Sequence, residues 1–108
     1  MRPLLHPALE DISLQGVLYA LADPVRLDLF KVLSQEPGGV SCTRCAPARM
    51  PKSSLSRHIR ILREAGLVRS ERRGAEVVNA ARIGEIDRRF PGLLPAILQA
   101  APEQGTTA

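Results

Sequence analysis

Serine and arginine side chains recur on one side of residues 51–65. When this segment is drawn as an α-helix, Leu55 lies within an apolar stripe. The opposite pole then carries Ser53, Arg57 and Arg60. Hydroxyl groups can meet phosphates or base edges, and an arginine fork can bond a guanine edge twice. The pattern therefore predicts a helix that contacts a nucleic acid, and the alternative is an amphipathic helix whose polar side only faces water.

Charge is distributed unevenly along the 108-residue chain, whose net charge is +4. Residues 44–73 hold nine basic side chains against two acidic ones, a local balance of +7, and the rest of the chain carries −3. Clustered cations displace counterions from phosphates, so this asymmetry favours a polyanionic partner. A merely solvated face would show mixed charge, whereas four cations surround a single outward acid, Glu64, on this helix.

The two cysteines, Cys42 and Cys45, are separated by two residues. One interpretation is a small buried hydrophobe at Cys42 with an incidental Cys45. A second is a thiol switch, because a helix cap at Ser41 with Arg44 nearby would lower the pKa of the Cys42 thiol and favour oxidation. A third is a bound metal or metalloid, although a closed zinc site needs four ligands, a metalloid needs three, and a third cysteine is lacking. No cofactor is assigned from the sequence.

The elements that position these residues follow from apolar periodicity and from helix breakers. Asp23 can accept a hydrogen bond from the first amides of a new helix, and Pro24 suits the first turn because it lacks an N–H group. Gly66 is expected to end the helix that begins at Pro51. The predicted helices span 11–22, 24–34, 51–65, 83–90 and 93–100, with one or two further turns at 41–46.

Two predicted strands, 67–73 and 76–79, flank Gly74 and indicate a hairpin whose tip carries Arg72 and Arg73. A mainly α-helical chain with such a basic hairpin has the outline of a winged helix-turn-helix fold. In this fold one helix enters the DNA major groove and the hairpin lies along the backbone or the adjacent minor groove. We expect three parts, namely an N-terminal arm at 1–10, the folded domain at 11–100 and a frayed tail at 101–108.

Two stretches, ADPVRL at 22–27 and PKSSLSRHIRILREAGLV at 51–68, resemble the ArsR/SmtB type of bacterial transcriptional regulator. The resemblance extends over residues 14–98. It implies a homodimeric winged-helix repressor that binds a dyad-symmetric operator in double-stranded DNA and leaves it when an inducer is sensed. Metal-sensing relatives carry a Cys-x-Cys motif before the recognition helix, which the spacing of Cys42 and Cys45 does not match. The inducer therefore stays unassigned.

The resemblance also adds Ser54, Ser56 and His58 to the DNA-binding face. For His58 the alternative is a half-buried packing residue that hydrogen-bonds a backbone group. The complete candidate DNA-binding set is Lys52, Ser53, Ser54, Ser56, Arg57, His58, Arg60, Arg72 and Arg73.

Dimerisation is expected through the first and last helices. Their apolar positions exceed what a small three-helix core can cover, and an uncovered apolar stripe favours a second copy of the chain. The candidate dimer residues are Leu14, Val17, Leu18, Leu21, Leu94, Ile97 and Leu98.

Several other functions are disfavoured by the sequence. No apolar run approaches the length of a membrane span and no secretory signal is visible, so we expect a cytoplasmic protein. Cys42 and Cys45 follow a Pro-Gly-Gly turn rather than a strand, which argues against a thiol-disulfide oxidoreductase. Phosphate loops, clustered carboxylates and nucleophile–base pairs are also missing, so an enzyme is not predicted. A protein-binding winged helix would carry acidic or apolar replacements at positions such as Ser53, Arg57 and Arg60, and these three positions carry none.

Overall fold

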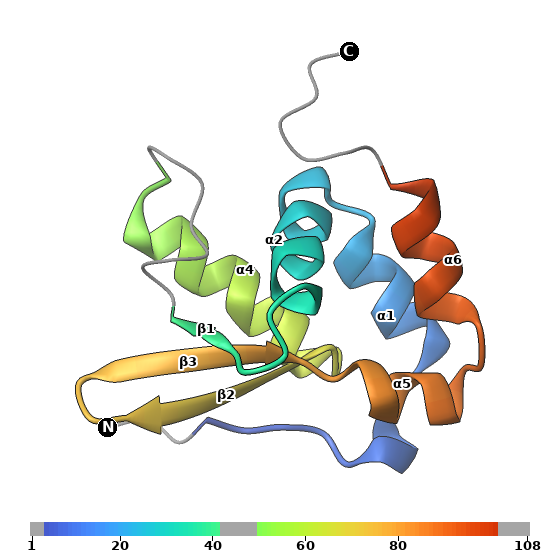
Figure 1. Ribbon diagram of the computed structural model, residues 1–108, viewed down its shortest axis with the longest axis horizontal. Helices are drawn as coiled ribbons and strands as arrows, with labels where there is room; N and C mark the ends of the chain where they lie inside the picture. Colours follow the sequence, from blue (N-terminus) through green and yellow to red (C-terminus); the bar gives the residue numbers. More distant parts are fainter. Residues whose placement is uncertain (1–3, 42–49, 102–108) are drawn as a thin grey trace.

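Helices and a small sheet make up the structure, a computed structural model that describes residues 4–41 and 50–101 (Figure 1). The elements in chain order are η1 (Leu9–Asp11), α1 (Leu14–Leu21), α2 (Pro24–Ser34), β1 (Val40–Ser41), α4 (Lys52–Glu64), β2 (Val68–Arg73), β3 (Glu76–Ala81), α5 (Ile83–Arg89) and α6 (Leu93–Ala100). No helix in these two ranges is long and apolar enough to cross a membrane.

The boundaries of α1 and α2 follow from side-chain caps. The Ser13 hydroxyl accepts from the Gly16 N–H at 3.0 Å, and an Asp23 carboxylate oxygen accepts from the Arg26 N–H at 3.0 Å. The predicted helix at 24–34 is confirmed. The first helix begins later than predicted, because residues 9–11 form a separate 3-10 turn and the Ile12 side chain is buried in the core.

The three strands form one antiparallel sheet in the order β1-β3-β2. The predicted hairpin is confirmed, with Arg73 opposite Glu76 beside the turn at Gly74. Strand β1 was not predicted, and in it Ser41 pairs with Val78. The rest of the predicted helical turns at 41–46 lies outside the described residues. Gly39, at a φ of 90°, makes the turn that brings β1 against β3, and a side chain there would collide with Val78.

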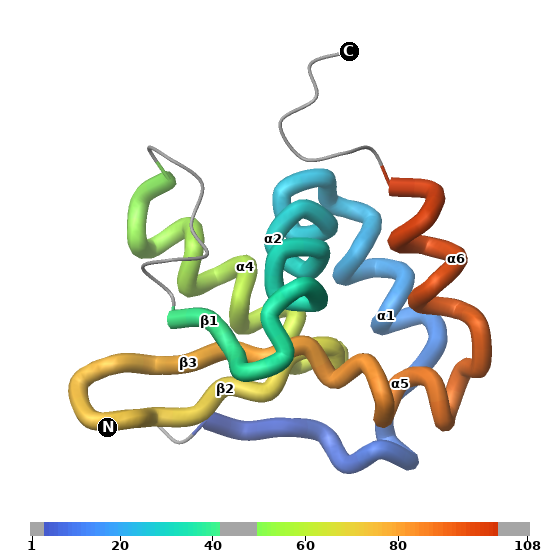
Figure 2. The backbone as a smooth tube through the Cα atoms, in the orientation of Figure 1, coloured from blue at the N-terminus to red at the C-terminus, as the bar shows by residue number. Residues whose placement is uncertain are grey.

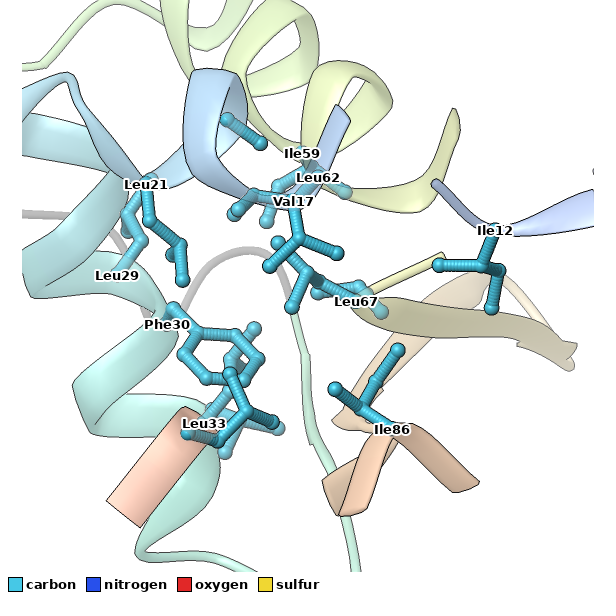
Figure 3. Close-up of a cluster of buried hydrophobic side chains, with 14 of the residues drawn as sticks. Ile12, Val17, Leu21, Leu29, Phe30, Leu33, Ile59, Leu62, Leu67 and Ile86 are labelled. Atoms are coloured by element: carbon cyan, nitrogen blue, oxygen red, sulfur yellow. The ribbon is translucent and has the colours of Figure 1, made fainter. Parts of the chain in front are cut away.

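One apolar core joins the helices to the sheet (Figure 3). Helix α2 contributes Phe30 and α4 contributes Leu62, and both side chains are fully buried. The other buried residues labelled in Figure 3 are Ile12, Val17, Leu21, Leu29, Leu33, Ile59, Leu67 and Ile86. Because α4 and the sheet share this core, the helix is held at a defined position relative to the hairpin.

The candidate dimer residues divide into buried and accessible groups. Val17, Leu21 and Leu94 are buried inside the chain and belong to its own core. Leu14 and Leu18 on α1 are exposed. Ile97 and Leu98 on α6 are half-buried. The accessible apolar surface is therefore narrower than the periodicity predicted.

Candidate nucleic-acid interface

Helix α4 presents one apolar and one polar face, as its sequence predicted. Leu55, Ile59 and Leu62 are buried against the core, while Ser53, Arg57 and Arg60 are exposed. Pro51 precedes the helix with extended backbone angles and supplies no side-chain cap. The chain leaves the helix through Gly66, at a φ of 87°, and enters β2 two residues later. The polar face of α4 thus lies beside the hairpin, the wing of the fold.

A cleft of about 500 Å³ lies between α4, the wing and the N-terminal residues. We name it the α4–wing cleft, and its lining residues are Leu4, Ser53, Ser56, Arg57, Ile59, Arg60, Arg63 and Val77. Within the described residues, neither Arg57 nor Arg60 takes part in an ion pair. The cleft therefore offers two exposed guanidinium groups and two hydroxyls to an anionic surface such as a DNA backbone.

The remaining predicted residues of α4 lie around this cleft. Lys52 is exposed in the first turn, whereas Ser54 and His58 are half-buried. The Nδ1 atom of His58 is buried and has no hydrogen-bond partner within the described part of the chain. The half-buried position of His58 fits the packing alternative, although Nδ1 does not make the expected bond to a backbone group.

The wing carries its cations at the hairpin tip. Arg72 and Arg73 are both exposed at the end of β2. Arg73 Nε lies 3.1 Å from Glu71 Oε1, in an ion pair whose two side chains are more than half exposed. Such a pair contributes little to stability and can be exchanged for a phosphate contact.

A buried polar network that was not predicted joins α4 to the wing. The Ser70 hydroxyl donates to Asn79 Oδ1 at 2.7 Å across the two strands, and Arg63 Nη1 donates to the Ser70 hydroxyl at 3.4 Å. Strand alternation was the available signal, since Ser70 lies on the same face of β2 as the buried Val68. The network fixes the angle between the helix and the strands that flank the cleft.

A second polar cluster holds the base of the wing. Arg82 is buried and donates from Nη2 to Glu85 Oε2 at 2.6 Å, while Arg69 donates from Nη2 to Glu85 Oε1 at 3.1 Å. The hydrogen bond from Arg82 is the main reason that the pKa of Glu85 is lowered to about 2. The carboxylate therefore stays charged and links both arginines at neutral pH.

The predicted sensing residues, Cys42 and Cys45, lie outside the described residues. The argument for a lowered Cys42 pKa depends on a helix cap at Ser41, which is the last residue of β1, and the residues that it would cap lie outside the described part of the chain. Residues 4–41 and 50–101 contain no group of three His, Cys, Asp or Glu side chains that could hold a metal ion.

Comparison with known proteins agrees with this geometry. A family model described as a helix-turn-helix domain matches residues 21–71. An uncharacterised HTH-type transcriptional regulator of Methanocaldococcus jannaschii, MJ1325, is 29% identical over 58 residues, which are 54% of this chain and 65% of that relative. This chain therefore matches less than two thirds of that relative's length.

Two solved structures share the fold. The crystal structure of an ArsR family transcriptional regulator superimposes with a TM-score of 0.64 and 27% identity, covering 77% of this chain and 90% of the other. An ArsR-like transcriptional regulator from Rhodococcus sp. RHA1 gives a TM-score of 0.59 and 23% identity, covering 82% and 92%, and supports the fold alone. The matched proteins are transcriptional regulators, which are not enzymes. Together with the helix-turn-helix match and the wing, they show that this chain has a winged helix-turn-helix fold similar to that of ArsR-type transcriptional regulators.

Proposed function

We propose that the chain is a homodimeric repressor that binds a dyad-symmetric operator and releases it when an inducer is sensed. In this proposal α4 enters the major groove and the wing follows the backbone or the adjacent minor groove. The observation that carries it is the α4–wing cleft, where Ser53, Ser56, Arg57 and Arg60 are gathered on one surface. Ser54 and His58 then lie at the margin of the contact and contribute less than the cleft residues.

Dimerisation is supported by exposed apolar side chains on α1. Leu14 is 40% exposed, Leu18 45% and Tyr19 67%. Helix α6, whose Ile97 and Leu98 are half-buried, lies at the opposite end of the molecule from the start of α4 (Figure 1). A dimer formed through α1 and α6 would leave both copies of α4 accessible. Two copies placed one DNA turn apart, about 34 Å, would match operator half-sites.

The test begins with selection of a binding sequence from a pool of random DNA duplexes, followed by mobility shifts at fixed salt. Arg57→Ala should weaken binding to the selected duplex by about 1–3 kcal/mol, because it removes a guanidinium from the cleft. Arg88→Ala is the matched control, since Arg88 is equally a surface arginine but lies on α5. Equal losses in the two variants, or failure to enrich any sequence, would contradict the proposal.

A further inference from the structure

The N-terminal residues 4–8 lie along the edge of the wing. Among residues 4–41 and 50–101, the sheet order leaves one edge of β2 without a strand neighbour, and the chain before η1 runs beside that edge (Figure 2). The ring of His6 covers it, with Nε2 accepting a hydrogen bond from the Ser70 N–H at 2.9 Å. One residue later the Pro7 carbonyl accepts from Arg82 Nη1 at 3.1 Å. We call residues 4–8 the arm.

The bond between the arm and β2 requires a neutral histidine. An imidazole nitrogen accepts a hydrogen bond only when it carries no proton, and the imidazolium ion donates from both nitrogens. Protonation of His6 at Nε2 would therefore place two donors against each other at the Ser70 N–H. The hydrogen bond would be lost rather than weakened.

The charges around His6 also oppose its protonation. Arg69 on β2, Arg63 on α4 and Arg82 after β3 all act on the imidazole. Glu85 on α5 is bonded to both Arg69 and Arg82, so its negative charge is already balanced. Burial, followed by the repulsion from the three arginines, lowers the pKa of His6 below its ordinary value of 6.5.

The arm is connected to the α4–wing cleft in two ways. Leu4 forms part of the cleft wall beside Arg57 and Arg60. Ser70, whose N–H is bonded to His6, also accepts from Arg63 of α4 through its hydroxyl. Displacing the arm would remove one wall of the cleft and disturb the residue that links the wing to α4.

We propose that the arm is a positioning element of the DNA-binding surface, latched onto β2 by neutral His6 and released when His6 takes up a proton. This inference rests on the proposed function. It makes specific DNA binding sensitive to acid through a residue that does not itself contact DNA. His6 acts by holding Leu4 and Ser70 in place.

The direction of the pH effect follows from linkage. Above pH 6.5 His6 is neutral whether the arm is bound to β2 or released from it. The hydrogen bond from the Ser70 N–H to His6 then stabilises the bound arm fully. As the pH falls below 6.5, His6 is protonated more readily in the released arm than in the bound arm. The equilibrium therefore shifts progressively towards the released arm. One proton per chain limits the change to about tenfold per pH unit for each chain.

The first test needs no DNA. In an NMR titration of the full chain, the His6 ring should titrate below pH 6.5, and the Ser70 amide signal should move with the same midpoint. In His6→Gln the side-chain oxygen can still accept from Ser70 but does not titrate, so the Ser70 signal should stay in place. A His6 midpoint at or above 6.5, or a Ser70 amide that ignores the titration, would overturn the latch.

The second test measures affinity for the selected duplex between pH 8 and pH 5.5, with each protein normalised to its own value at pH 8. Wild type should lose affinity as the pH falls, whereas His6→Gln should give a flat profile. The chain has two histidines, so His58→Gln separates the contribution of α4, and this variant should still lose affinity as the pH falls. On an unselected duplex of equal length, wild type should bind no more weakly in acid, because added positive charge favours phosphate contacts.

The outcomes separate two failures. If no duplex is ever selected, the proposed function is wrong, whatever the titration of His6 shows. If a duplex is selected but wild type has a flat profile, or His6→Gln has the same slope as wild type, the latch is wrong. A flat profile in His58→Gln would also overturn it, since the pH effect would then belong to α4.

Discussion

At the scale of single residues, Arg26 explains why an arginine follows the Asp23-Pro24 boundary. Its side chain is 8% exposed and folds back from α2 to the end of α1. Nε donates to the Ala20 carbonyl at 2.8 Å and Nη2 to the Tyr19 carbonyl at 3.4 Å. The guanidinium also lies 5.4 Å from the centre of the Tyr19 ring. It thus caps the Ala20 carbonyl at the end of α1 and adds a second donor to the Tyr19 carbonyl, which also accepts from the Ala22 N–H.

Replacing Arg26 should destabilise the fold. Arg26→Ala removes a buried charged donor from two carbonyls, and we expect the free energy of unfolding to fall by about 2–3 kcal/mol in urea titrations. Arg88→Ala, an exposed arginine on α5, should stay within about 0.5 kcal/mol of wild type. If both variants unfold at the same urea concentration, the capping role assigned to Arg26 is incorrect.

The residues of the α4 face were predictable and those of the arm were not. Ser53, Arg57 and Arg60 follow from the helical period alone, because a helix of this length against a core has only one exposed side. The bond from Ser70 to His6 joins residues 64 positions apart and depends on where the chain crosses the sheet edge. No local pattern in the sequence encodes that crossing.

At the scale of elements, the connection between α4 and β2 depends on Gly66. The Gly66 N–H donates to the Arg63 carbonyl and the Leu67 N–H donates to the Leu62 carbonyl, each at 3.0 Å. This pattern closes the helix and turns the chain directly into the wing. The expected role of Gly66 at the helix end is therefore confirmed, and α4 and the wing cannot move far apart.

Gly66→Ala should cost more stability than the same change at another left-handed glycine. A Cβ at Gly66 would meet the Cδ1 and Cγ1 atoms of Ile12, whereas a Cβ at Gly92, at a φ of 81°, would meet nothing within 4 Å. Gly92→Ala should therefore lose only the backbone term of about 1–2 kcal/mol. Gly66→Ala should lose about 1–3 kcal/mol more in the same urea titration. Equal losses would mean that Ile12 moves aside without cost.

Element boundaries were predictable where a breaker or cap lies in the sequence. Pro24 and Gly66 fix the start of α2 and the end of α4 within the chain itself. Strand β1 has only two residues, too few to show an alternation, and it exists because β3 lies beside it. The pairing of Ser41 with Val78 was consequently not predicted.

At the scale of the whole molecule, the accessible apolar surface of α1 is separated from the cationic surface of α4. Leu14 and Leu18 are exposed on α1, while Val17 on the same helix is buried in the core. Apolar periodicity cannot distinguish the side of α1 that packs in its own core from a side that contacts a second copy, because both require apolar residues at helical spacing. The candidate dimer set was therefore wider than the surface that a second copy could contact.

Leu18→Glu should dissociate the proposed dimer without unfolding the chain. Leu18 is 45% exposed, so a glutamate can remain in water in the separated protomer, whereas burial in an interface would leave its charge without a partner. A symmetric interface contains the substitution twice. We expect dissociation to become at least about tenfold easier in sedimentation equilibrium, with an unchanged helical circular dichroism spectrum.

Leu5→Glu is the matched control, because Leu5 is 71% exposed and belongs to the arm rather than to α1 or α6, so the substitution should leave the mass of the assembly unchanged. Leu18→Glu should also weaken binding to a two-half-site duplex more than binding to a single half-site. This difference arises because only the dimer holds two α4 helices at a fixed spacing. A wild-type chain that sediments as a monomer at micromolar concentration, or a Leu18→Glu variant with wild-type mass, would show that α1 is not the dimer surface.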